Sequence, residues 1–335
     1  MADRYLSVNC QGNLDYDMKK PLAIFLDKSS LYPEDLDFSL LDEIADWQWF
    51  DNVTLGDVRH CIEDAEIVVT NKVLLNREII ENSKKLKLIC VAATGVNNVD
   101  VVTAGQQGVK VCNVRAYATS SVAQHVYSLI LSLNRKLFPY KQSVTDGEWS
   151  RSDFFCYFGQ PICDLEDKVI GIIGFGELGR AVAKIARCFG MKVLIARRGE
   201  HDLREGRVDL TTLLSTSDVV TLHCPLTESN HHMISSTELE TMKPDAILIN
   251  TARGGLIDEA ALLHALEHNK IAAAGLDVLE QEPPAVEHSL INYHDDNLII
   301  TPHIAWASRQ SRQRLVNEIA KNIQAYVGGQ PRNII

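Results

Sequence analysis

Short apolar runs alternate along most of the chain with segments whose apolar residues recur at helical spacing. Runs of this length are typical of buried strands, and their alternation with helical segments favours a parallel sheet with helices packed on it. In the first part of the chain the predicted strands are residues 22–26, 67–70, 86–90 and 109–113, and the predicted helices are residues 34–46 and 76–82.

The second half of the chain repeats this alternation. A long helix is predicted to run from a cap at Ser120 or Ser121 to about Lys136 and to carry the chain into a second α/β unit. Asp258 is suited to cap a later helix, and Gly328-Gly329 follows the last one. The predicted strands here are residues 169–173, 192–196, 218–223, 246–250, 271–276 and 297–301, and the last helix is residues 308–326.

Composition and charge limit the classes of protein to which this chain can belong. With 46% hydrophobic and 23% charged residues, the 335-residue chain has the composition of a soluble globular protein. No apolar run approaches the ~20 residues of a membrane span, and the first residues lack the apolar core of a signal peptide, so a cytoplasmic location is expected. The net charge of −11 argues against a nucleic-acid partner, which would need a basic face.

Three glycines follow the apolar run at residues 169–173 with the spacing G-x-G-x-x-G. In this arrangement Gly174 allows a tight turn, Gly176 leaves room for a diphosphate, and Gly179 lets the next helix pack close to the strand. The free amides at the start of that helix would face the phosphates. Glycine turns of this kind are common, but the strand before this one and the helix after it favour a dinucleotide site.

These patterns predict an α/β protein of two doubly wound parallel-sheet domains. Because the dinucleotide unit occupies the middle of the chain, residues 121–304 are expected to form a Rossmann domain. This domain would be inserted into a flavodoxin-like substrate domain of residues 21–120 and 305–335, with a cleft between the two. Residues 1–20 are expected to be a loose N-terminal arm. Residues 145–167 lack periodicity and are rich in aromatic side chains, which suits either a dimer arm or packing beneath a loop.

Strongly polar residues follow three other predicted strands: Arg253, Glu282 and His303. The carboxyl ends of parallel strands meet at one edge of a sheet, so these side chains should converge on the cofactor. Hydride transfer to a 2-keto acid needs a cation for the carboxylate and carbonyl oxygen, which suits Arg253, and an acid for the developing alkoxide, which suits His303. Glu282 would orient the imidazole and favour its protonated form. The plainer interpretations are a surface ion pair, a solvated loop carboxylate and a core histidine.

No metal site is predicted. His223, His231 and His232 straddle a loop and lack a third ligand with sensible spacing. The eight cysteines are scattered, and several lie inside apolar strands, so they are interpreted as small buried hydrophobic residues. Trp306, three residues after His303, is predicted to line the substrate pocket, with core packing as the alternative.

Taken together, these motifs resemble those of the D-isomer-specific 2-hydroxyacid dehydrogenases, from about Pro21 to Tyr326. NVRAY at residues 113–117 with SVAQH at 121–125 is similar to the glycerate dehydrogenase and hydroxypyruvate or glyoxylate reductase branch. Formate dehydrogenases, which resemble this family, carry glutamine where this chain has Glu282, so the carboxylate points to a 2-hydroxyacid substrate. The matching motifs are GFGELG at 174–179, HCPLT at 223–227, TARGG at 251–255, Asp277 with Glu282-Pro283, and Pro302-His303.

The resemblance implies roles for further residues. Arg253, Glu282 and His303 would be the catalytic set, and the main-chain amides of Thr94 and Gly95 would hold the substrate carboxylate. The resemblance also implies a homodimer formed through the cofactor domains, with Asp277 as partner of the nicotinamide carboxamide. The expected cofactor-binding residues are Gly174, Phe175, Gly176, Glu177, Leu178, Gly179, Arg197, Arg198, Cys224, Pro225, Thr251, Ala252 and Asp277.

The residues after the second strand of the dinucleotide unit bear on the choice of nicotinamide. NAD-specific sites carry a carboxylate there, about 20 residues after the glycine turn, whereas this chain has Arg197 and Arg198. Two arginines can bind the 2′-phosphate that a carboxylate would repel, so NADP(H) is predicted to be favoured over NAD(H). The alternative is that the arginines stack on adenine or face solvent while Glu200 or Asp202 reaches the ribose.

The expected activity is NAD(P)H-dependent interconversion of a small 2-keto acid, such as hydroxypyruvate or glyoxylate, and its D-2-hydroxy acid, with His303 as proton donor and acceptor. Selectivity among such acids depends on pocket shape, because one methylene changes binding by only ~1–3 kcal/mol. The competing hypothesis is a nucleotide-sensing binding protein that resembles the C-terminal-binding corepressors. The intact catalytic set is compatible with it, but the sequence has no extended tail or basic patch for partners.

Overall fold

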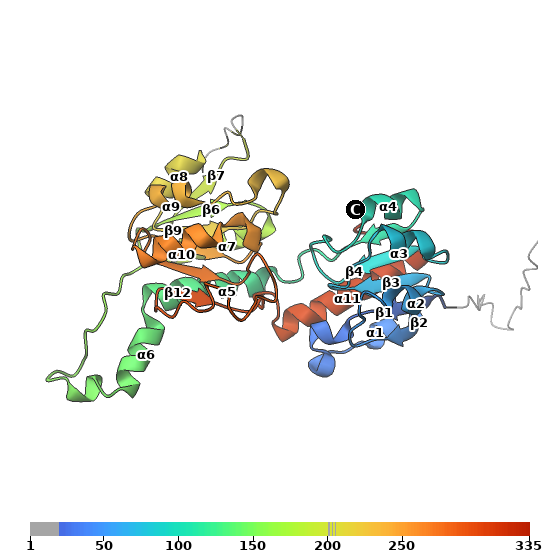
Figure 1. The fold of residues 1–335 in the computed structure, drawn as a ribbon, viewed down its shortest axis with the longest axis horizontal. Helices are drawn as coiled ribbons and strands as arrows, with labels where there is room; N and C mark the ends of the chain where they lie inside the picture. Colours follow the sequence, from blue (N-terminus) through green and yellow to red (C-terminus); the bar gives the residue numbers. More distant parts are fainter. Residues whose placement is uncertain (1–19, 200–201, 203, 205) are drawn as a thin grey trace, which may run out of the picture. The chain divides into compact units, whose positions relative to one another are not determined.

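The computed structural model describes residues 20–199, 202, 204 and 206–335, and these fall into two compact units. One unit contains the chain up to Tyr117 together with Arg312–Ile335, and the other contains Ala118–Ser311. The second unit is therefore inserted into a unit made from both ends of the chain. Each is an open, fully parallel sheet with helices on both faces (Figure 1), which confirms the predicted fold class.

The sheet of the first unit has the strand order β2-β1-β3-β4-β5. This is the flavodoxin-like order, in which the direction of winding reverses between β1 and β3. The central strands β3 and β4 are buried along their whole length, and so their sequences are continuous apolar runs. The strands are β1 (Leu22–Phe25), β2 (Asp46–Trp49), β3 (Ile67–Thr70), β4 (Leu88–Val91) and β5 (Lys110–Cys112).

Helices cover both faces of this sheet. One face is packed against three short helices, whose Ile62 and Ile80 join Val68 and Ile89 in a single apolar cluster. The other face is covered by the long last helix, in which Asn322 contacts the buried thiol of Cys90. The helices of this unit are α1 (Ser39–Asp42), α2 (Val58–Ile62), α3 (Arg77–Asn82), α4 (Val101–Gln106) and α11 (Arg309–Val327), which begins within the second unit.

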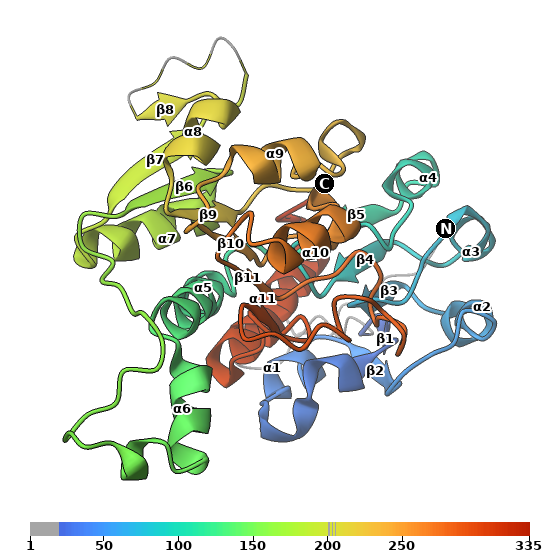
Figure 2. The ribbon, with the colours of Figure 1, turned by 60° about the vertical axis from the view of Figure 1, so that its left-hand side comes forward.

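The sheet of the second unit has the order β12-β11-β10-β9-β6-β7-β8. Winding starts at β6, and the direction reverses between β6 and β9, as in dinucleotide-binding sheets. The helices α5 and α7 pack together on one face, and α8, α9 and α10 form the layer on the other (Figure 2). The strands are β6 (Val169–Ile173), β7 (Lys192–Ala196), β8 (Arg207–Val208), β9 (Val219–Leu222), β10 (Ile247–Asn250), β11 (Ala273–Leu276) and β12 (Leu298–Ile300); the helices are α5 (Thr119–Asn134), α6 (Leu137–Thr145), α7 (Glu177–Cys188), α8 (Leu210–Thr216), α9 (Ser236–Thr241) and α10 (Glu259–Glu267).

Two local predictions are wrong. The helix expected at residues 34–46 is reduced to the single turn of α1, and its last residue begins the edge strand β2. The stacked rings of Trp47 and Trp49, with centroids 4.6 Å apart, stabilise this strand, which is only half-buried and so lacks an apolar run. Neither Ser120 nor Ser121 caps α5, which begins at Thr119 without a side-chain cap.

Other local predictions are confirmed. Asp258 caps α10 by accepting hydrogen bonds from the amides of Ala260 and Ala261, and α11 ends directly before Gly328. Residues 146–168 are irregular apart from one short 3₁₀ turn, as the absence of periodicity predicted. Among the described residues, no helix has the length and apolar character needed to cross a membrane.

Candidate active site

The glycine turn lies at the carboxyl end of β6, where the winding of the second sheet reverses. Gly174 has a φ of +95°, and a Cβ there would overlap the backbone of His223 and Cys224 at the end of β9. A Cβ at Gly179 would overlap the Gly174 carbonyl oxygen, so this glycine lets α7 approach β6 closely. Both positions therefore require glycine for the backbone to adopt this turn.

The same turn has room for a bound diphosphate. A Cβ at Gly176 would meet no described atom within 4 Å, and Gly176 directly precedes the first amides of α7. Nearby strand ends carry two buried polar atoms, Thr251 Oγ1 and His223 Nδ1, with no hydrogen-bond partner among the described residues. Open space beside helix amides and unpaired polar atoms are what a dinucleotide would fill, so these residues fit the predicted cofactor.

The other cofactor residues named from the sequence lie at the same edge of this sheet. The Phe175 ring lies under the Arg207 guanidinium, and Glu177 accepts a hydrogen bond from Thr119. Cys224 and Pro225 follow β9, and Ala252 follows β10. Burial lowers the pKa of the His223 imidazole to about 4, so that ring is neutral near pH 7 and is a poor candidate for the proton donor.

Arg253 follows β10 in a tightly held loop. The buried Asn250 side chain accepts a hydrogen bond from the Ala252 amide at 3.0 Å and donates one to the Arg253 carbonyl at 2.8 Å. The Arg253 guanidinium donates to the Ala252 carbonyl at 2.6 Å, and its other N–H groups bond to no described residue. The Arg253 guanidinium is therefore oriented by its own loop and retains N–H donors for an anionic ligand.

Gly254 brings this loop against the loop that follows β11. A Cβ at Gly254 would overlap the main-chain atoms of Leu279 and Glu280. The Leu279 amide in turn donates to Glu282 Oε1 at 3.0 Å. The close backbone contact thus places the loop of Arg253 beside the loop of Glu282.

His303 and Glu282 form a close side-chain pair in the site. His303 Nδ1 lies 2.6 Å from Glu282 Oε2, and both side chains remain partly exposed. His303 has a φ of +54°, a left-handed conformation that is uncommon for residues other than glycine and is found at functional sites. With Nδ1 held by the carboxylate, Nε2 has no partner among the described residues and is available to a substrate.

Asp277 and Trp306 fix the backbone around His303. The buried Asp277 carboxylate accepts hydrogen bonds from the Thr301 hydroxyl at 2.6 Å and from the amides of Ile304 and Ala305 at 2.9 and 2.8 Å. The indole of Trp306 donates to the His303 carbonyl at 2.8 Å. Both residues therefore position the histidine loop, and their predicted contacts with nicotinamide and substrate stay predictions.

Thr94 and Gly95 belong to the first unit, directly after β4. Their amides donate to no described acceptor, as expected of amides reserved for a ligand. The same unit has a pocket of about 240 Å³ at the reversal point of its sheet, which the sequence did not reveal. Asp27 lines it, and burial raises the pKa of this carboxyl despite hydrogen bonds from the amides of Asn71 and Lys72.

These features define a class of protein: a nicotinamide-dependent dehydrogenase, with a dinucleotide-binding sheet whose strand ends carry an arginine and a histidine–carboxylate pair. Residues 127–305 match the family described as D-isomer specific 2-hydroxyacid dehydrogenase, NAD binding domain. The chain belongs to this family.

Relatives refine the assignment. Glycerate dehydrogenase of Methylorubrum extorquens is 44% identical over 93% of this chain and 98% of its own. Hydroxypyruvate reductase of Blautia hydrogenotrophica is 37% identical, with the same coverage. Among solved structures, an acyclic imino acid reductase in complex with NADPH and D-Arg has a TM-score of 0.83 and 30% identity, over 94% of this chain and 99% of that one. The matches place the chain in the glycerate and hydroxypyruvate branch as an NAD(P)H-dependent oxidoreductase, and none supports the binding-protein alternative.

The contact at Gly254 leads to a testable prediction. Gly254→Ala should displace the backbone at Leu279 and with it Glu282, because a Cβ has no space there. A shift of about 1 Å at a catalytic group lowers turnover by about 100-fold, and overpacking costs ~1–3 kcal/mol of stability. Steady-state kinetics and thermal unfolding measure both effects. Gly56→Ala, where a Cβ meets nothing within 4 Å, is the control and should behave as wild type. Wild-type turnover in Gly254→Ala would contradict this account of the loop.

Proposed function

We propose that this enzyme reduces a small 2-keto acid of the hydroxypyruvate or glyoxylate type, with Arg253 binding the substrate and His303 donating the proton. The observation that carries this assignment is the contact of 2.6 Å between His303 Nδ1 and Glu282 Oε2, which leaves His303 Nε2 available. The names of the glycerate dehydrogenase and hydroxypyruvate reductase relatives support this class of substrate. The second unit would be the cofactor domain, and the first the substrate domain.

The residues act on separate parts of the substrate. The Arg253 fork binds the carboxylate and polarises the carbonyl oxygen, and the Thr94 and Gly95 amides supply further carboxylate donors. When bound, the reduced nicotinamide supplies the hydride to C2. His303 Nε2 gives its proton to the carbonyl oxygen, so that the keto group becomes a hydroxyl. Glu282 holds Nδ1 and stabilises the imidazolium before transfer.

In the oxidative direction the same groups work in reverse. Neutral His303 accepts the hydroxyl proton at Nε2 as the hydride leaves C2, and Glu282 stabilises the imidazolium that forms. The two directions therefore need opposite protonation states of one residue.

A location in the cytoplasm is also part of this proposal.

Preference for NADP(H) is supported by the residues after β7. The Arg197 and Arg198 side chains are exposed and bond to no described side chain, which suits them to a 2′-phosphate. Asp202, one alternative ribose acceptor, is held by Arg204 at 2.6 Å, a bond that lowers the pKa of the Asp202 carboxyl. The other alternative, Glu200, lies outside the described residues. The imino acid reductase with the similar fold was solved with NADPH.

A homodimer is supported by an exposed apolar segment that comprises α6 and residues 149–162. Phe154, Phe155 and Phe158 are 76%, 92% and 87% exposed within the chain, so they do not pack beneath a loop. Figure 1 shows α6 and the strand-free chain after it extending from the body of their own unit. Exposed aromatic patches of this kind mark protein–protein contacts, and a second copy of the chain is the proposed partner.

The roles of His303 can be tested through pH. Because reduction uses the imidazolium and oxidation the neutral ring, the rate of reduction should fall as pH rises while the rate of oxidation increases. His303→Ala should lower turnover ~10²- to 10⁴-fold and remove both trends, whereas Arg253→Ala should mainly impair substrate use. The control is His268→Gln, because His268 is an exposed histidine directly after α10. A shared pH profile for both directions would rule out the assignment.

The cofactor preference can be tested with one variant and its control. Arg198→Ala should raise the KM for NADPH by roughly 10- to 100-fold and leave that for NADH unchanged, because a charge-assisted bond contributes ~1.5–3 kcal/mol. Lys192→Ala removes a charge at the opposite end of the same strand and should alter neither value. Initial rates with each cofactor below saturation give the comparison. Clear wild-type preference for NADH would refute the proposal.

The dimer is tested by mass in solution. Light scattering after size exclusion should give twice the chain mass, and Phe155→Ser with Phe158→Ser should shift the protein toward monomer at micromolar concentration. Val286→Ser is the control, because Val286 is equally exposed at 83% but lies outside this segment. A monomeric wild-type protein would disprove this surface as a dimer interface.

A further inference from the structure

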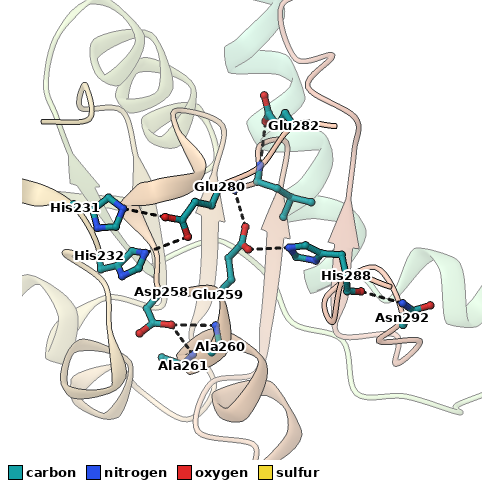
Figure 3. Close-up of polar contacts among 11 residues, drawn as sticks. His231, His232, Asp258, Glu259, Ala260, Ala261, Glu280, Glu282, His288 and Asn292 are labelled. Carbon is teal, nitrogen blue, oxygen red and sulfur yellow. Dashed lines mark hydrogen bonds and ion pairs between the residues drawn. The ribbon is translucent and has the colours of Figure 1, made fainter. Parts of the chain in front are cut away.

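Two adjacent histidines and a glutamate converge in the second unit (Figure 3). His231 Nε2 lies 3.0 Å from Glu280 Oε1, and His232 Nε2 lies 3.3 Å from Glu280 Oε2. One ligand atom from each of the three residues falls within 4.8 Å of the other two. No third ligand lies near these histidines in the sequence, and the fold supplies one from a loop 48 residues away.

The backbone brings the two imidazoles to the same side. Neighbouring side chains of an extended segment point in opposite directions, but His232 has a φ of +52°, and its ring stacks on that of His231 with centroids 3.9 Å apart. The His232 amide donates to the Gly255 carbonyl at 2.8 Å, which fixes this turn against the loop after β10. The left-handed residue therefore presents two nitrogen ligands together.

The glutamate is held just as firmly. The Glu280 amide donates to Glu259 Oε1 at 2.8 Å, and Glu259 Oε2 lies 2.9 Å from His288 Nε2 (Figure 3). A carboxylate with its backbone anchored by Glu259 is suited to be a ligand.

The donor set selects the kind of ion. Two imidazole nitrogens and one carboxylate oxygen are ligands of zinc and similar transition metals, whereas magnesium and calcium prefer oxygen alone. Three protein ligands leave a position for water. The ligand atoms of all three residues lie within 4.8 Å of one another, so a single cation can bind all three.

We propose that His231, His232 and Glu280 form a binding site for a divalent transition-metal ion such as Zn²⁺, and that the ion ties the chain after β9 to the loop after β11. Glu280 precedes Glu282 by two residues, but the two carboxylates have different partners, so the site is separate from the catalytic pair. The proposal does not depend on the substrate or on the nicotinamide preference.

A second histidine pair in the same unit serves as a matched comparison. His264 on α10 and His268 directly after it also stack, with centroids 4.0 Å apart, but His268 Nδ1 is bonded to the His264 carbonyl. No carboxylate joins them among the clusters found in the described residues. This pair tests whether two stacked imidazoles are enough to bind the ion.

The experiment is a titration of the full metal-free chain with Zn²⁺, in which binding is measured by calorimetry or by competition with a chelator. Wild type should show one site that is lost in His231→Gln and in Glu280→Gln, with affinity reduced beyond the ~10- to 100-fold typical of outer-shell changes. Both positions are exposed, so the variants should fold, which thermal unfolding without metal verifies. The His264→Gln, His268→Gln double variant should bind as wild type does.

Two further readouts make the assignment unambiguous. Zn²⁺ should raise the thermal midpoint of wild type but not of Glu280→Gln, and Mg²⁺ should raise neither. Co²⁺ bound at the site should lack the near-ultraviolet charge-transfer band of thiolate ligands, which separates it from binding at the exposed Cys163 or Cys188. Equal Zn²⁺ affinity in wild type and His231→Gln, or a thiolate band on Co²⁺, would overturn the proposal. None of these measurements uses activity, so they are independent of the proposed reaction.

Discussion

The buried carboxylate of Asp277 is the constraint on which the geometry of the catalytic histidine depends. It lies at the end of β11 and accepts hydrogen bonds from a hydroxyl and two amides of residues 301–305, at the end of β12. The Asp277 carbonyl also accepts from the His303 amide at 2.8 Å. A carboxyl group with almost no exposure is tolerated only when its oxygens are bonded in this way. These hydrogen bonds to Asp277 hold His303 in its left-handed conformation.

Helix α5 adds further hydrogen bonds to this loop. His125 Nε2 lies 2.9 Å from the Thr301 hydroxyl, and the Ser121 hydroxyl donates to the Ala305 carbonyl at 2.7 Å. The serine expected to cap α5 therefore binds a distant loop instead. Side-chain hydroxyls are often favoured at helix starts for local reasons, but here a tertiary acceptor competes successfully for the same group. Hydrogen bonds consequently join the start of α5 to the loop that carries His303.

The strands that could be predicted from the sequence are those whose side chains are most fully buried. Strands β3, β4, β6, β9 and β10 were located because strands covered on both faces must be apolar almost throughout, which is visible in any sequence. The edge strand β2 and the short helices α2 and α4 were missed because each buries too few side chains to produce a period. The dinucleotide turn and the strand-end residues were predictable because the carboxyl ends of parallel strands lie at one edge of the sheet. The pairing of Glu280 with His231 and His232 was not, because it depends on the backbone turn at His232.

The loop after β11 shows how one segment can serve two chemical purposes. Its two carboxylates are separated by a single residue, Gln281, yet Glu280 contacts His231 and His232 while Glu282 contacts His303. The backbone between them is anchored twice: the Glu280 amide bonds to Glu259, and the Leu279 amide bonds to Glu282 itself. A ligand on Glu280 would therefore act on a backbone that is already fixed, and would stiffen the loop rather than move it. On this argument the histidine–glutamate cluster stabilises the position of Glu282 without taking part in proton transfer, because among the described residues no hydrogen bond connects its imidazoles to His303 except through that loop.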